Sequence, residues 1–169
     1  MPILETNRLT LTELSTDDAP FIFELLNSPG WLEFIGDRGI KTLDDAINYI
    51  VNGPIKSYEK NNFGLYSVKL KDGNIPIGIC GLIKRDSLED IDIGFAFLPD
   101  YEGKGYAYES ADAILSNAKI ELRIKRIVAI TIKENSKSIQ LLEKTGFVFE
   151  KLIQLPDDAE ELMLFAIQL

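Results

Sequence analysis

The chain has 169 residues, of which 46% are hydrophobic and 27% charged, a size and composition typical of one globular domain. Its formal net charge of -9 disfavours a nucleic-acid partner, because a phosphate backbone is bound by a basic face, and favours cationic groups such as amines. The absence of histidine, of any 18-residue apolar run and of a signal-like N-terminus excludes imidazole catalysis and predicts a cytoplasmic single domain over residues 1–169, without a membrane partner.

The N-terminal part of the chain predicts a strand and a helix. Apolar and polar side chains alternate over residues 8–14, as they do in a half-buried strand. Ser15 and Asp18 then have the spacing of a capping box, and apolar residues follow at helical spacing over residues 21–26. Pro29-Gly30 is expected to end this helix.

A second helix and a hairpin are predicted next. Thr42 and Asp45 repeat the capping signal, and Gly53-Pro54 is expected to kink or end the helix that they start. Residues 64–70 and 75–84 read as two strands joined by a turn, which predicts a hairpin. The single cysteine lies in the apolar second strand, so we interpret Cys80 as a buried structural thiol rather than a nucleophile.

The C-terminal half predicts strands on either side of two helices. Residues 91–98 alternate, with the four apolar residues Ile91, Ile93, Phe95 and Phe97 on one face. A helix follows Gly105, and another spans about residues 135–144 and stops at Gly146. Further strands are predicted at residues 127–132, 147–153 and 162–168, the last two joined by a turn at 156–158. Strand, helix and strand over residues 91–132 form a right-handed parallel crossover, so the fold class is α+β: a mixed sheet with flanking helices.

The turn Gly103-Lys104-Gly105, between a predicted strand and a helix, is a candidate anion site. Backbone N–H groups at a helix N-terminus are free to bind a phosphate or diphosphate, and glycine lets the backbone approach such a ligand. The turn matches neither the nucleoside-triphosphate loop nor the dinucleotide fingerprint. On the turn alone, ligand binding and a plain tight turn remain equal alternatives. The absence of histidine, with one cysteine, predicts that there is no transition-metal site.

Three segments together resemble one family. Glu102-Gly103-Lys104-Gly105-Tyr106-Ala107 is similar to the acetyl-CoA motif of the GNAT superfamily of N-acetyltransferases, except that Glu102 stands where the family has Gln or Arg. The segment from Asn135 to Phe147 is similar to a second block of that superfamily, and residues 5–11 resemble the opening of its RimJ/RimL-like branch. The resemblance covers nearly the whole chain. It implies a mostly antiparallel sheet in which one parallel strand pair splays apart.

The resemblance also implies an acetyl-CoA site. The pantetheine arm would lie in the splayed gap and bond to strand backbone, and the turn would hold the diphosphate. Asn135 would bond the pantetheine or cap its helix, and the two roles are compatible. The residues assigned to acetyl-CoA in this way are Phe95, Ala96, Phe97, Leu98, Gly103, Lys104, Gly105, Tyr106, Ala107 and Asn135.

Catalytic roles are carried over to two residues. Ser138 would protonate or hydrogen-bond the leaving thiolate, since Leu142 replaces the tyrosine acid of many family members; a helix hydroxyl bonded to backbone is the alternative. Asp92 would accept the proton of the amine through water, with a solvated or ion-paired strand carboxylate as the alternative. Asp157 is a further candidate base.

The resemblance leaves the acceptor open. Trp31, Phe34 and Asp37 would line its pocket, or be core residues and a turn with a local ion pair. The acceptor would be a primary amine, either a peptide or protein N-terminus or a small amine such as a polyamine, an amino acid or an aminoglycoside. The protein would act as a monomer or a homodimer. The rival function is a non-catalytic acyl-CoA-binding module.

Overall fold

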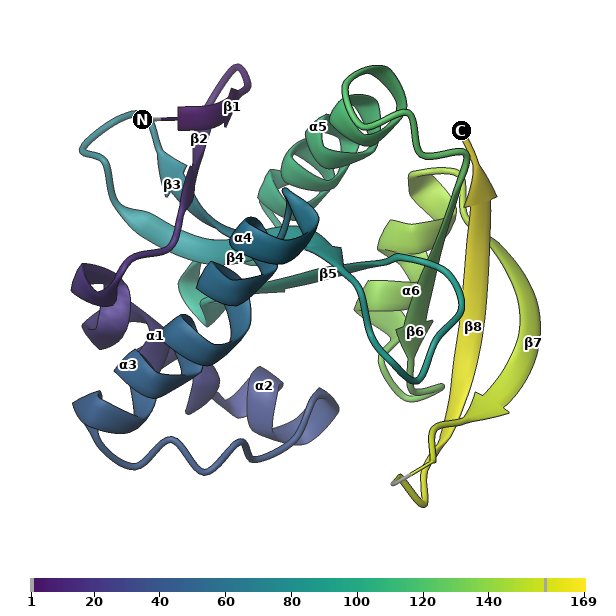
Figure 1. The fold of residues 1–169 in the computed structure, drawn as a ribbon, viewed down its shortest axis with the longest axis horizontal. Helices are drawn as coiled ribbons and strands as arrows, with labels where there is room; N and C mark the ends of the chain where they lie inside the picture. Colours follow the sequence, from purple (N-terminus) through teal and green to yellow (C-terminus); the bar gives the residue numbers. More distant parts are fainter. Residues whose placement is uncertain (1, 157) are drawn as a thin grey trace.

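A computed structural model describes residues 2–156 and 158–169. One sheet of eight strands, β1 to β8, forms the centre of the protein, and six α-helices with three shorter helical turns connect the strands (Figure 1). Asp157, one of the candidate bases, lies outside the described residues. The elements are β1 Pro2–Glu5, β2 Leu9–Glu13, η1 Thr16–Asp18, α1 Ala19–Leu26, α2 Pro29–Phe34, α3 Leu43–Ile50, η2 Val51–Ile55, α4 Lys56–Asn61, β3 Leu65–Leu70, β4 Pro76–Ile83, β5 Asp92–Phe97, η3 Pro99–Tyr101, α5 Tyr106–Ile120, β6 Arg126–Thr131, α6 Ser136–Lys144, β7 Val148–Gln154 and β8 Glu161–Gln168.

The sheet is mixed, as the alternation of strands and helices predicted. Its strand order is β1-β2-β3-β4-β5-β6-β8-β7, and every neighbouring pair is antiparallel except β5 and β6. The crossover from β5 through α5 to β6 supplies this parallel pair. The predicted hairpin is confirmed as β3 and β4, which pair antiparallel around the turn between them, with a shift of register between Val68 and Lys69.

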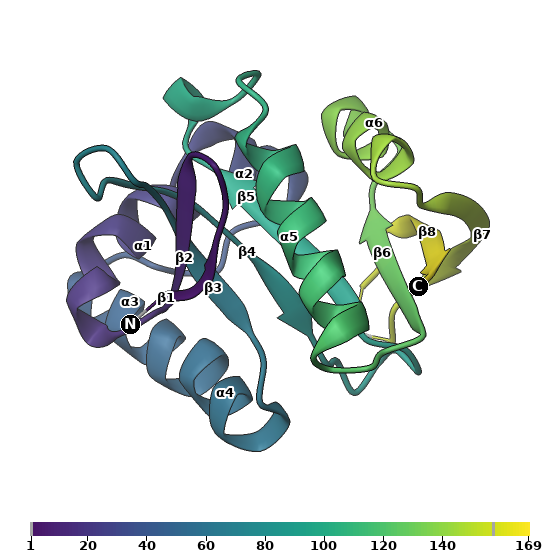
Figure 2. The ribbon, with the colours of Figure 1, turned by 90° about the horizontal axis from the view of Figure 1, so that it is seen from above.

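The helices bury two separate apolar clusters against the sheet. The first contains α5 and α6 side chains together with Ile93 and Phe97 of β5. The second contains α1 and α3 side chains with Trp31 of α2 and Leu98, which follows β5. Helices α5 and α1 therefore lie on opposite faces of the sheet (Figures 1 and 2), and β5 contributes to both clusters because its side chains alternate.

Two N-terminal features correct or refine the predicted helices. Both capping boxes are present, at Ser15 and at Thr42. Pro29 does not end α1, which stops at Leu26; it is the first residue of α2 instead. Proline is suited to that position because the first helical N–H has no intrahelical partner and a φ near −65° is already helical. Gly53-Pro54 does kink its helix, through the π turn η2 between α3 and α4.

The parallel pair β5 and β6 separates almost as soon as it forms. The register joins these strands at one position, Asp92 opposite Val128, where the Val128 N–H donates to the Ile91 carbonyl at 3.0 Å. On its other edge β5 is paired with β4 along its whole length. The predicted splay is therefore present, and it begins directly after Asp92.

No helix among the described residues is both long and apolar enough to cross a bilayer. Cys80 is fully buried in β4, and burial raises the pKa of its thiol to about 12. This is the setting expected of a structural cysteine.

Candidate active site

The turn before α5 combines two left-handed glycines with a helix N-terminus. Gly103 and Gly105 have φ values of 73° and 83°, a region that residues with a side chain rarely adopt. No side chain of residues 2–156 or 158–169 caps α5, whose N-cap is Gly105, so the first N–H groups of the helix keep their hydrogen-bonding capacity. A Cβ built on Gly103 would meet no atom within 4 Å. The turn is thus open beside Gly103.

The backbone of β5 is available on the edge that faces the gap. Strand alternation places the N–H and C=O groups of Phe95 and Phe97 on the β6 side, beyond the last position that pairs with β6. Ala96 is opposite Ile79 of β4, and the N–H of Leu98 donates to the Ile77 carbonyl at 2.9 Å. Of the four predicted strand residues, Phe95 and Phe97 therefore offer backbone groups to the gap.

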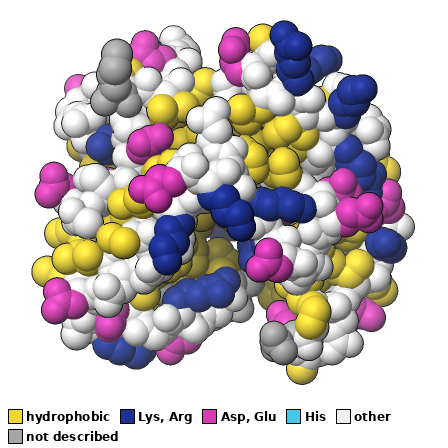
Figure 3. Space-filling model, in the orientation of Figure 1, with side chains coloured by type: hydrophobic (Ala, Val, Ile, Leu, Met, Phe, Trp, Pro, Cys, Tyr) yellow, Lys and Arg dark blue, Asp and Glu magenta, His cyan; other side chains and the backbone are white. Residues whose placement is uncertain are grey.

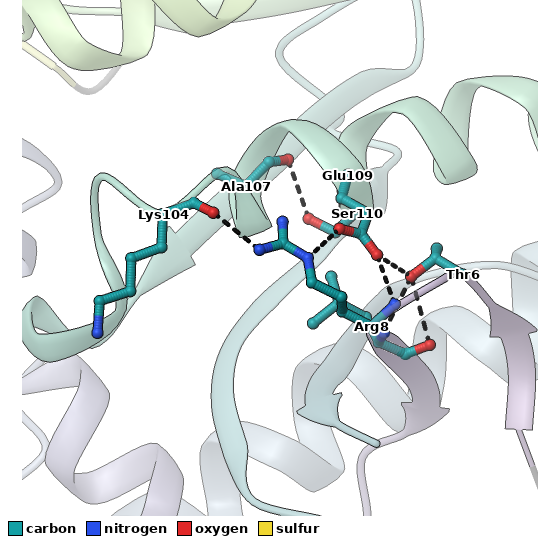
Figure 4. A network of polar contacts seen from close by, with 7 residues as sticks. Thr6, Arg8, Lys104, Ala107, Glu109 and Ser110 are labelled. Carbon is teal, nitrogen blue, oxygen red and sulfur yellow. Dashed lines mark hydrogen bonds and ion pairs between the residues drawn. The ribbon is translucent and has the colours of Figure 1, made fainter. Parts of the chain in front are cut away.

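The N-terminal hairpin is tied to the start of α5 by a polar network that sequence reasoning missed (Figure 4). The carboxylate of Glu109 accepts hydrogen bonds from the Thr6 hydroxyl at 2.6 Å, the Arg8 backbone N–H at 2.8 Å and the Arg8 Nε at 2.7 Å. Partial burial raises the pKa of Glu109, but these hydrogen bonds together bring it below its usual value. Arg8 Nη1 also donates to the Lys104 carbonyl at 3.0 Å.

Asp92 is the most deeply buried acidic group of the site. Its side chain is 1% exposed, and Arg85 Nε lies 3.2 Å from one carboxylate oxygen and 3.3 Å from the other. Burial raises its pKa to about 6, although Arg85 and Lys84 oppose that shift. A carboxylate with a pKa near 6 is ionised at neutral pH and still basic enough to accept a proton. The structure shows the ion-paired alternative, with Arg85 as the partner of Asp92.

Basic side chains surround the part of the site next to Asp92. Burial raises the pKa of the Tyr49 hydroxyl in α3, and the nearby charges of Arg38 and Arg85 lower it in part. Arg85 therefore forms an ion pair with Asp92 and also lies close enough to Tyr49 for its charge to affect that hydroxyl. In the orientation of Figure 1, the surface of the protein has a hollow near its centre, with Lys and Arg side chains around it (Figure 3). Arg38 and Arg85 thus place positive charge near Tyr49, and Arg85 and Lys84 place it near Asp92, although the chain as a whole is acidic.

The three residues predicted to line the acceptor pocket differ in burial. Trp31 is buried in the α1–α3 cluster, and its indole N–H has no hydrogen-bond partner among the residues that the structure describes. Phe34, at the end of α2, is partly buried. Asp37 is exposed; it accepts a hydrogen bond from the Gly39 N–H at 2.8 Å and pairs with Lys41 Nζ at 3.3 Å. The ion pair of this turn is therefore between Asp37 and Lys41. The charge of Arg38 acts instead on the hydroxyl of Tyr49, whose pKa it lowers.

Helix α6 lies on the far side of the gap and carries the two remaining candidates. Asn135 is its N-cap, and its side-chain oxygen accepts a hydrogen bond from the Ser138 N–H at 3.3 Å. This is the capping role that the sequence allowed. The backbone N–H of Ser138 is engaged in the cap, and its partly buried hydroxyl does not take part in that bond. Among the described residues, no cluster of three or more His, Cys, Asp or Glu side chains could hold a metal ion.

Comparison with known proteins agrees with this geometry. The family model described as an acetyltransferase (GNAT) domain matches residues 8–148. The chain belongs to the GNAT acetyltransferase family. The chain is 29% identical to the uncharacterized N-acetyltransferase YnaD of Bacillus subtilis over 143 residues. The aligned region covers 85% of this chain and 81% of YnaD.

Solved GNAT structures have the same architecture. An acetyltransferase from Agrobacterium tumefaciens superposes with a TM-score of 0.84 at 24% identity, covering 99% of this chain and 94% of that one. The ribosomal alpha-N-protein acetyltransferase RimL, in complex with coenzyme A, superposes with a TM-score of 0.85 at 15% identity, covering 100% and 98%. The predicted family and fold are confirmed. Arg8, Glu109, Arg85 and Tyr49 lie around the candidate site and were not singled out from the sequence.

Proposed function

We propose that this GNAT protein transfers the acetyl group of acetyl-CoA to a primary amine, and that residues 1–169 act as one acetyltransferase domain. The observation that carries the proposal is the divergence of β5 from β6 immediately after Asp92, beside a turn with two left-handed glycines. Free strand backbone suits an extended amide-containing arm, and free N–H groups at a helix start suit a diphosphate. Acetyl-CoA would be bound by the backbone of Phe95 and Phe97, by the turn residues 103–107 and by Asn135.

The reaction needs one bond formed and one broken. The protonated acceptor first gives up one proton, and the neutral amine attacks the carbonyl carbon of the thioester to form the carbon–nitrogen bond. The carbon–sulfur bond then breaks, the nitrogen gives up its second proton, and the leaving thiolate takes up one proton. Asp92 would accept the amine proton through water, because burial raises its pKa to about 6, which leaves the carboxylate ionised at neutral pH and basic enough to take up a proton. The Ser138 hydroxyl would donate a proton or a hydrogen bond to the thiolate. Backbone N–H groups of β5 would polarise the carbonyl.

The local charge narrows the choice of acceptor. Arg38 and Arg85 near Tyr49, with Lys84 near Asp92, would repel a polyamine and attract an anionic group next to the reacting amine. We therefore favour an amine that also carries a carboxylate or phosphate, either a small molecule or the N-terminal residue of an acidic peptide. This choice replaces the preference for cationic acceptors that the net charge alone would suggest.

The direct test is release of the coenzyme A thiol from acetyl-CoA with a panel of amines. Turnover with any amine, together with an acetylated product found by mass spectrometry, supports the enzyme. The non-catalytic acyl-CoA-binding module predicts binding without turnover for every amine, so that result with a representative panel would favour the rival function.

A matched pair of variants tests the diphosphate site. Asparagine and aspartate both tolerate the left-handed conformation, and a side chain at Gly103 projects into open space. Gly103→Asp should therefore bind acetyl-CoA more weakly than Gly103→Asn, because only aspartate sets a negative charge against the phosphates. Equal affinity of the two variants in calorimetry would place the diphosphate elsewhere.

A further inference from the structure

Arg8 is oriented by residues far away in the sequence. It precedes β2, and its backbone N–H and Nε both donate to the carboxylate of Glu109, in the first turn of α5. The Thr6 hydroxyl donates to the same carboxylate, as Figure 4 shows. Two bonds from one residue to one carboxylate restrict the rotation of the arginine side chain. The guanidinium is thereby directed at the turn before α5.

The guanidinium contacts three successive residues of that turn. Nη1 donates to the Lys104 carbonyl at 3.0 Å, and Cζ lies 4.4 Å from the centroid of the Tyr106 ring. Nη2 would lie 3.2 Å from a Cβ built on Gly105. Arg8 therefore packs on one side of the turn.

The bond to the Lys104 carbonyl has a consequence for the next N–H group. In a trans peptide the C=O and N–H bonds of one plane point in opposite directions. No cis peptide occurs among the described residues. Because the Lys104 carbonyl is directed at Arg8, the Gly105 N–H is directed away from Arg8. That N–H belongs to the turn where we place the diphosphate.

We propose that Arg8 is a positioning residue for the diphosphate-binding turn, supported by Glu109 and Thr6. Its bond to the Lys104 carbonyl holds the Gly105 N–H toward the bound diphosphate, and its positive charge adds to the attraction for that group. The inference rests on the proposed acetyl-CoA site. It differs from a purely structural role, in which Arg8 only ties the N-terminal hairpin to α5.

Two acetyl donors separate these roles. S-Acetylpantetheine has the same thioester and pantetheine arm as acetyl-CoA but lacks the diphosphate and nucleotide. The measurement is kcat/KM for each donor with one fixed amine, and the quantity compared is the ratio of the two values. Wild type should prefer acetyl-CoA. Arg8→Met should lose about 10- to 100-fold with acetyl-CoA, the range for a lost charge-assisted hydrogen bond, and lose little with S-acetylpantetheine.

Arg8→Lys and Arg126→Met complete the set. Lysine keeps the positive charge but lacks the planar guanidinium that donates to the Glu109 carboxylate and the Lys104 carbonyl at the same time. Arg8→Lys should therefore restore only part of the preference for acetyl-CoA over S-acetylpantetheine. If Arg8→Met does not fold, Arg8→Lys decides the matter by the same ratio. Arg126 pairs with Asp90 and Glu150 away from the turn, so Arg126→Met should leave the ratio unchanged.

The outcomes distinguish this inference from the function on which it rests. Equal losses with both donors, or no loss with either, would overturn the role of Arg8 while wild type still prefers acetyl-CoA. A wild-type protein with no turnover, or with equal kcat/KM for both donors, would overturn the proposed diphosphate site itself, and the role of Arg8 with it.

Discussion

Lys137 of α6 and Glu102 of the turn before α5 form an ion pair, with 3.0 Å between Nζ and Oε2. The two residues belong to elements on opposite sides of the gap between β5 and β6, so the pair spans its edge. Glu102 is also the position at which the chain departs from the Gln or Arg of the family motif. The proposed phosphate site thus contains a negative charge that is paired with a lysine.

Glu102→Gln should bind acetyl-CoA more tightly than wild type. The substitution removes a charge that repels phosphate and releases Lys137 to attract it. Both residues are solvent-exposed in part, so the gain should be modest, about 2- to 5-fold in Kd at low ionic strength, and smaller at high salt. Calorimetry at two salt concentrations measures it. Asp100→Asn, which makes the same change of charge in the neighbouring η3, controls for net charge; a Glu102→Gln protein that binds no better than this control would contradict the expectation.

Asp92→Asn should abolish the acidic limb of the pH–rate profile. The folded-state pKa of Asp92 is raised to about 6, so the carboxylate base is lost as the pH falls through 6, and kcat/KM should fall with it. Asparagine cannot accept the proton at any pH. The variant should therefore be slower by about 10²- to 10⁴-fold at pH 8 and show no inflection near 6.

Asp90→Asn is the matched control for that profile. Asp90 precedes β5, is partly exposed and pairs with Arg126, so its loss should leave the inflection near pH 6 in place. An inflection retained in Asp92→Asn would assign the base to another group.

Ser138→Ala should lower kcat with little change in the affinity for acetyl-CoA. The α6 cap uses the Ser138 backbone N–H, which alanine keeps, so the substitution removes only the hydroxyl. A general acid contributes about 10²- to 10⁴-fold, and a hydrogen bond to the thiolate alone would contribute less. Ser136→Ala, on an exposed residue of the same helix turn, should be close to wild type. Equal kcat values for Ser138→Ala and Ser136→Ala would contradict a catalytic role for the Ser138 hydroxyl.

Local signals explain what the sequence predicted well. Capping boxes, glycines in a turn and strict alternation act over a few residues, which is why both helix starts, the turn before α5 and the faces of β5 were predicted correctly. The same local signals are ambiguous at Pro29, because proline both follows helices and begins them. β1 was missed because four largely exposed residues carry no periodic pattern.

The site depends on contacts that no local pattern encodes. Arg8 and Glu109 are 101 residues apart and meet only because β2 and α5 pack together. Arg85, in the β4–β5 loop, pairs with Asp92, and Arg38, in the α2–α3 loop, lies close enough to Tyr49 for its charge to lower the pKa of that hydroxyl. The charges to which we assign the choice of acceptor could therefore not be predicted from the net charge, which sums all residues of the chain.

Arg38 provides the test of the acceptor class. Arg85 contacts Asp92 and cannot be changed without disturbing the proposed base, whereas Arg38 lies near Tyr49 on the α2–α3 loop and is exposed. Wild type should acetylate an amino acid with higher kcat/KM than its carboxamide, which differs only in the anionic group. Spermidine should be a poor acceptor.

Arg38→Gln should reduce this preference by removing one of the attracting charges, and Arg38→Lys should retain most of it. An exposed charge pair is worth up to about 1 kcal/mol, so the ratio of the two kcat/KM values should fall by at most about 5-fold. The fall should shrink as salt is added, because the interaction is electrostatic. A wild-type protein that prefers the carboxamide or spermidine would remain an acetyltransferase, but its acceptor would not be anionic. In that case the positive charge around Asp92 would serve mainly to keep the buried carboxylate ionised, since Arg85 and Lys84 both lower its pKa.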